Sequence, residues 1–172
     1  MIKLVDSEYV KELEDTIAKM LAPLKNIPLK VVIKSLSGFE ILDFDRNDPK
    51  DKYLLNCLVK ALKNVVKTIN NKGIAAKRPN EVGNAVEPFV KAALTNLGCK
   101  ADTPNTTAGK KKSSGYPDIV FRDLYGRDNY LECKTFNQED LNSSLRTFYL
   151  SPSSNFKITT NAHHFLLTSS HK

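Results

Sequence analysis

Two acidic residues and one lysine lie on neighbouring segments whose residue pattern is typical of β-strands. The segments run from Pro117 to Phe121 and from Tyr130 to Thr135, and a hairpin-like connection joins them. Side chains alternate between the two faces of a strand, so Glu132 and Lys134 share one face. If the two strands pair as a hairpin, that face also gathers Asp118, while the opposite face supplies apolar residues to the core.

This grouping of side chains favours metal-dependent chemistry on a phosphate ester. Two nearby carboxylates repel each other, and a hard divalent cation such as Mg²⁺ relieves the repulsion while keeping sites for water and substrate phosphate. A neighbouring ammonium group can orient the attacking water or stabilise charge that gathers on the phosphate. These are the parts that phosphodiester hydrolysis needs. The alternative is a surface hairpin with ordinary alternation of charged side chains.

The elements that would position these residues follow from hydrophobic periodicity. Helices are expected over residues 7–24, 54–69 and from about Asn80 to Leu97, while residues 28–36 fit either a strand or a short helix. Pro88 falls inside the third helix, so that helix either kinks there or begins near Glu87. A polar loop over 103–114, a short polar helix after Asn137 and a last strand at 165–167 complete the pattern. The order predicts an α/β fold around a mixed sheet.

The acidic residues and the lysine also resemble a known signature. Tyr116-Pro117-Asp118, thirteen intervening residues and Glu132-Cys133-Lys134 match the PD-(D/E)xK motif of the restriction-endonuclease-like nuclease superfamily. The resemblance covers roughly Asn80 to the C-terminus, so it implies a nuclease core with a restriction-endonuclease-like mixed sheet at 79–172. It leaves the first half of the chain unexplained, for which the helical periodicity predicts a helical N-terminal region at 1–78.

The resemblance implies a role for each matching position. Asp118 and Glu132 would bind Mg²⁺ together with the main-chain carbonyl of Cys133, whose thiol would face the core, and Lys134 would be the catalytic lysine. The superfamily often places another acidic residue on the preceding helix. Glu87 is the first choice for that position, and Glu81 is the alternative.

The C-terminal region is similar to the segment that follows the catalytic strand in some type II restriction endonucleases. The similar residues are 146–152, 156–158 and 163–167. The implied activity is magnesium-dependent cleavage of double-stranded DNA within a restriction–modification system. Cleavage at palindromic sites would imply a homodimer, because twofold DNA sites mirror twofold protein symmetry.

Two other functions remain open at this stage. A structure-specific or repair nuclease, such as a junction resolvase, would use the same side chains on a different DNA shape. A truncated, inactive DNA-binding or assembly module is the non-enzymatic alternative, because the chain ends directly after the last predicted strand.

A second triplet of the acidic-x-Lys form occurs at Asp48-Pro49-Lys50. It lies in a predicted acidic loop beside a proline and lacks a strand pattern. We therefore interpret it as exposed charge rather than as part of a catalytic site.

Positive charge is in excess along the chain, with a formal net charge of +7 and a pI of about 9.3. A surplus of this size favours a polyanionic partner such as nucleic acid, although a lysine-rich soluble protein would also show it. Candidate contacts to DNA are Lys110, Lys111, Lys112, Lys157 and His163. The alternatives are a solvated loop for the three consecutive lysines and a partly buried histidine at a strand start.

Three widely spaced cysteines, Cys57, Cys99 and Cys133, make a disulfide framework or a structural zinc site unexpected. The N-terminus lacks the apolar run of a signal peptide, and we find no apolar stretch long enough to cross a membrane. These features predict a cytoplasmic location.

Overall fold

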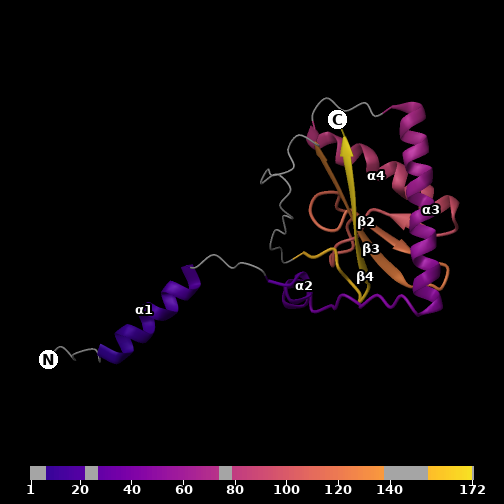
Figure 1. Cartoon of the computed structure of the whole chain (residues 1–172). Helices are drawn as coiled ribbons and strands as arrows, with labels where there is room; N and C mark the ends of the chain where they lie inside the picture. Colours follow the sequence, from indigo (N-terminus) through magenta and orange to yellow (C-terminus); the bar gives the residue numbers. More distant parts are fainter. Residues whose placement is uncertain (1–6, 22–26, 74–78, 138–154, 172) are drawn as a thin grey trace.

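The structure is a computed structural model that describes residues 7–21, 27–73, 79–137 and 155–171 (Figure 1). Its elements in chain order are α1 (Ser7–Leu21), α2 (Leu29–Ser37), α3 (Pro49–Lys72), α4 (Pro79–Asn96), β1 (Lys100–Asp102), β2 (Ile119–Arg122), β3 (Asp128–Asn137) and β4 (His163–His171). The four strands form one sheet in the order β1-β2-β3-β4. The β1–β2 and β2–β3 pairs are antiparallel and the β3–β4 pair is parallel. The predicted α/β class with a mixed sheet is therefore confirmed.

Helix α3 begins five residues before the predicted apolar stripe. The Asp48 side chain accepts hydrogen bonds from the backbone N–H groups of Lys50 and Asp51, and Pro49 occupies the first turn. A side-chain acceptor at this position and a proline just after it are both favourable at a helix N-terminus. The Asp48-Pro49-Lys50 triplet is thus a helix start, which accounts for its acidic residue without any catalytic role.

Helix α4 continues through Pro88, so it does not begin near Glu87. One side of α4 and one side of α3 pack in the same core, against Ile119, Phe121, Leu131 and Cys133 of the strands. Figure 1 shows the two helices on the same side of the sheet. This layer holds α4 beside β2, which Asp118 directly precedes, and beside β3, which carries Glu132.

The opposite face of the sheet is covered by α2 and by the chain before β4. Ile33 of α2 packs with Tyr130, Ile158 and Ala162. The segment 28–36 is therefore mostly helical, which resolves the choice between strand and helix. Both faces of the sheet therefore carry buried side chains, although Leu166 of β4 is 58% exposed.

Helices α1, α2 and α3 make up most of the described part of residues 7–73, and α3 shares one core with the sheet. The division at residues 78 and 79 remains a prediction. The short helix expected after Asn137 and the similar residues 146–152 lie outside the described residues. No helix in the described parts of the chain combines the length and apolar character that crossing a bilayer requires.

Candidate active site

Asp118 and Glu132 lie at matching positions of the β2–β3 hairpin. Ile119 pairs with Leu131 in the antiparallel register, and continuing that register by one residue places Asp118 opposite Glu132. Residues opposite each other in an antiparallel pair point to the same face. The structure thus brings the two predicted carboxylates together.

Glu132 is almost completely buried, with 4% of the residue exposed. Its Oε1 lies 2.8 Å from Lys134 Nζ, whereas its buried Oε2 has no hydrogen-bond partner within the described part of the chain. Burial raises the pKa of Glu132, the hydrogen bond from Lys134 opposes this rise, and the charge of Asp118 adds to it. A buried oxygen without a partner carries a desolvation cost that a bound cation would remove.

The Asp118 carboxylate is held by the neighbouring strand. Its Oδ2 accepts a hydrogen bond from the backbone N–H of Cys133 at 2.8 Å. The Cys133 thiol is buried in the core, and burial raises its pKa well above the ordinary value. The thiol is therefore neutral and faces the core, as the resemblance implied.

Glu87 of α4 is the third carboxylate near this pair. Its side chain is mostly buried, and its Oε2 lies 4.0 Å from Lys91 Nζ. Burial raises the pKa of Glu87, and the charges of Asp118 and Glu132 contribute to the rise. The side chain of Glu81 is outside the described residues, so the choice between the two glutamates remains a prediction.

The donor set fits a magnesium ion with two protein carboxylates. Across the described ranges, no group of three or more His, Cys, Asp and Glu side chains is placed to hold one metal ion. Magnesium commonly takes only one or two carboxylates and fills its other positions with water and substrate phosphate. Asp118 and Glu132 supply two such carboxylates, and the Glu132 Oε2, which has no partner among the described residues, is a candidate ligand.

Comparison with known proteins identifies the family of this chain. A model of the family described as "Type II restriction enzyme MjaV family" matches residues 23–172, which include both strands of the site. The chain belongs to the MjaV family. It is 40% identical over 178 residues to the type II restriction enzyme MjaV of Methanocaldococcus jannaschii, a match that covers 95% of this chain and 77% of that protein. No solved structure matches.

In this MjaV family member, Lys157 is a buried cation rather than a surface contact for DNA. Only 4% of it is exposed, and its Nζ donates hydrogen bonds to the main-chain oxygens of Gly115 and Pro117, the latter at 2.6 Å. Burial lowers its pKa, against the opposing charges of Asp118, Glu132 and Glu87. Lys157 therefore supports the turn that leads into Asp118. Its apolar neighbours in the sequence, Phe156 and Ile158, were a signal of this burial.

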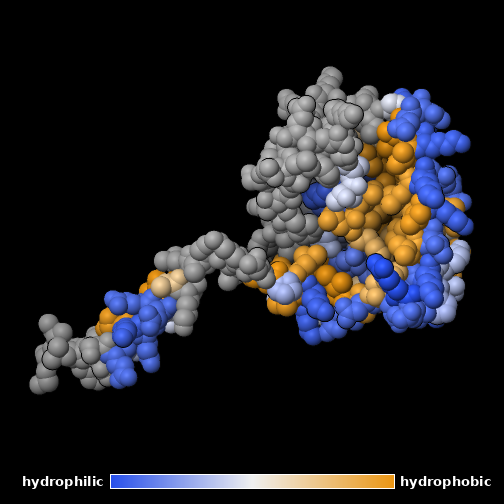
Figure 2. All heavy atoms as spheres, in the orientation of Figure 1, coloured by the Kyte–Doolittle hydropathy of each residue, from blue (hydrophilic) through white to orange (hydrophobic). Residues whose placement is uncertain are grey.

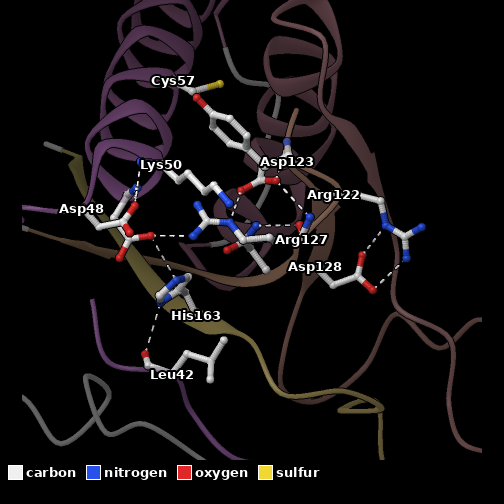
Figure 3. Close-up of polar contacts among 12 residues, drawn as sticks. Leu42, Asp48, Lys50, Cys57, Arg122, Asp123, Arg127, Asp128 and His163 are labelled. Atoms are coloured by element: carbon white, nitrogen blue, oxygen red, sulfur yellow. Dashed lines mark hydrogen bonds and ion pairs between the residues drawn. The ribbon is translucent and has the colours of Figure 1, made fainter. Parts of the chain in front are cut away.

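His163 is also buried, which agrees with the alternative of a histidine inside the protein. It belongs to an ionic cluster of Asp51, Asp123, Arg127 and His163, here called the Asp51 cluster (Figure 3). Its Nε2 lies 3.3 Å from Asp51 Oδ1, and its Nδ1 lies 3.2 Å from the Leu42 carbonyl oxygen. Both ring nitrogens therefore face protein groups rather than a surface that DNA could reach.

The three consecutive lysines are all exposed. Lys111 pairs with Asp102 at 2.5 Å. Exposure is necessary for the predicted phosphate contacts of Lys110, Lys111 and Lys112 but does not test them, so these contacts remain predictions.

A tyrosine–histidine pair beside the carboxylates was not identified as a unit from the sequence. The Tyr116 hydroxyl and His164 Nδ1 are hydrogen-bonded, and β4 places His164 next to Tyr130 of β3. Burial, with the charge of His163, lowers the pKa of His164 to about 4. His164 is therefore neutral near pH 7 and presents no positive charge to the site.

Proposed function

We propose that this protein is a magnesium-dependent type II restriction endonuclease that hydrolyses phosphodiester bonds of double-stranded DNA. The observation that carries the proposal is the buried Asp118–Glu132 pair with Lys134 bound to Glu132, in a chain of the MjaV family. The family match favours restriction over junction resolution or repair.

The proposed roles follow from the geometry of each side chain. Asp118, Glu132 and the Cys133 carbonyl would hold Mg²⁺, which polarises the phosphate and activates water for attack. Lys134 keeps 41% of its side chain exposed, so its ammonium can contact a phosphate oxygen and stabilise the charge that develops there. Glu87 would add negative charge behind the pair.

The finer fold, the domain division and the oligomeric state belong to the same proposal. Helix α4 is followed by three antiparallel strands, β1 to β3, and by β4, which is parallel to β3. This order supports a restriction-endonuclease-like core at 79–172, preceded in the sequence by a helical region at 1–78. A homodimer would suit a twofold DNA site.

The decisive test is DNA cleavage with matched lysine variants. Purified protein is incubated with mixed-sequence plasmid DNA and Mg²⁺ or EDTA. We expect discrete fragments with Mg²⁺ alone, and a fall in rate of about 100-fold or more in Lys134→Ala. Lys72→Ala, an exposed lysine in the last turn of α3, should cut normally.

Two results would contradict this assignment. Cleavage that is equal in Lys134→Ala and Lys72→Ala would place the chemistry elsewhere. Preference for branched DNA regardless of sequence would favour a junction-resolving nuclease instead.

A further inference from the structure

Helix α3 carries an apolar stripe apart from its buried side. The stripe consists of Leu55, Val59, Leu62 and Val66, which follow one another at intervals of four and three residues. This spacing is that of a coiled-coil seam. Leu55, Val59 and Val66 are exposed. Figure 2 shows an apolar surface between α3 and β4, bordered by hydrophilic residues along the outer side of α3.

Helix α1 carries a matching stripe. Val10, Leu13 and Ile17 follow at intervals of three and four residues, and all described side chains of this helix, residues 8–18, are exposed. A helix of 15 residues is only marginally stable in water by itself. Its apolar side therefore needs a partner surface.

The charges of the two helices are complementary. Helix α3 has six lysines and one acidic residue, Asp51, and Asp51 is buried. Helix α1 has four acidic residues and two lysines. On a helical projection, Glu14 flanks the α1 stripe, and Lys52 and Lys63 lie along the outer side of the α3 stripe. Opposite charges beside an apolar seam determine which helices pair.

The topology disfavours docking of α1 onto α3 of the same chain. Helix α2 packs on the Tyr130 face of the sheet, and α3 packs on the opposite, Leu131 face. Only residues 22–28 separate α1 from α2, and such a segment spans at most roughly 27 Å when fully extended. It would have to pass around the edge of the sheet before α1 could lie along α3. A second copy can present its α3 without this detour.

We propose that α1 docks onto the α3 stripe of a second copy of this chain, so that two copies exchange their first helices. The exchange supplies the interface of a homodimer. It therefore rests on the homodimer that is part of the proposed function. The docking itself uses none of the nuclease residues, so its test requires neither DNA nor magnesium.

The test compares three variants of the full chain by sedimentation and light scattering in metal-free buffer. Wild type is expected at the mass of two 19.3 kDa chains. Leu13→Glu with Ile17→Glu should give monomers, and so should Val59→Glu with Val66→Glu. Lys11→Glu on the polar side of α1 changes the net charge as much as the α1 double variant and should remain dimeric. Circular dichroism checks that each variant is folded, which is expected because the replaced side chains are exposed.

Mixing the two monomeric variants distinguishes exchange from docking within one chain. The α1 variant retains a native α3, and the α3 variant retains a native α1, so one intact contact can form between them. Heterodimers should therefore appear in the mixture, with weaker association than wild type.

A monomeric wild type, dimers in both double variants, or a mixture that stays monomeric would each overturn the exchange. Cleavage assays remain separate from this result. Monomers that still cut DNA with Mg²⁺ would refute the exchange alone, whereas exchanged dimers without cleavage would refute the nuclease proposal alone.

Discussion

Lys134 Nζ lies 2.8 Å from Oε1 of Glu132, while the other carboxylate oxygen of Glu132 is buried and lacks a hydrogen-bond partner among the described residues. The lysine therefore neutralises only one side of this carboxylate. Burial raises the pKa of Glu132, and the charge of Asp118 adds to this rise. In the proposed site, the second oxygen of Glu132 would bind the cation while Lys134 stays on the first.

The first prediction is that Glu132→Gln separates stability from activity. The amide removes a buried charge, so the free energy of unfolding in metal-free buffer should rise by about 1 kcal/mol. Cleavage should fall by about 100-fold or more, and added Mg²⁺ should no longer stabilise the protein. Chemical denaturation with and without Mg²⁺ measures both effects. Equal magnesium stabilisation in the variant and wild type would argue against Glu132 as a ligand.

The second prediction concerns the pH dependence of stability at His164. Its pKa in the folded protein is lowered to about 4 from 6.5, so the unfolded chain binds the proton more readily. The stability that this causes is fully present above pH 6.5 and is lost as the pH falls towards 4. His164→Gln, which keeps a hydrogen-bonding group near Tyr116, should reduce this loss. Unfolding curves across this pH interval test it, and parallel profiles for variant and wild type would contradict it.

The third prediction is that Lys157 is needed for the fold around Asp118. Lys157→Met should remove two hydrogen bonds to main-chain oxygens and lower the free energy of unfolding by about 2 kcal/mol. The same substitution at the exposed Lys111 should have an effect near zero. Denaturant titration of both variants provides the comparison, and equal losses would show that burial of Lys157 does not matter.

The fourth prediction compares two arginines of the β2–β3 hairpin (Figure 3). Arg127 has 27% of its side chain exposed and bonds the buried carboxylates of Asp51 and Asp123. Burial would raise the pKa of Asp51, but the Asp45 amide and Arg127 hold it below its ordinary value. Arg127→Leu leaves both carboxylates buried without this partner, so we expect a loss of about 3 kcal/mol.

Arg122 serves as the matched control for this prediction. It has 55% of its side chain exposed and pairs with Asp128, so Arg122→Leu should lower the free energy of unfolding much less than Arg127→Leu, because solvent screens an exposed ion pair. Thermal and chemical unfolding of the two variants measure the difference. A larger loss at Arg122 than at Arg127 would refute the structural importance of the Asp51 cluster.

The sequence by itself determined the features that depend on local periodicity. Alternation along two strands placed Asp118, Glu132 and Lys134 on one face, and helical spacing located α3 and α4. It also indicated the core position of Cys133, because that residue lies between two residues of the polar face. Neighbours in the chain are sufficient for such patterns, since strand and helix geometry repeat over a few residues.

Only the tertiary structure decided what depends on contacts between distant segments. It buried Lys157 under the turn at Gly115 and Pro117, and it enclosed His163 beside Asp51, although lysine and histidine side chains are normally exposed. It also set β4 parallel to β3 and carried α4 through Pro88. Burial of a charged side chain is stable only where another part of the chain supplies its hydrogen-bond and ionic partners, and the identity of those partners cannot be read from local spacing.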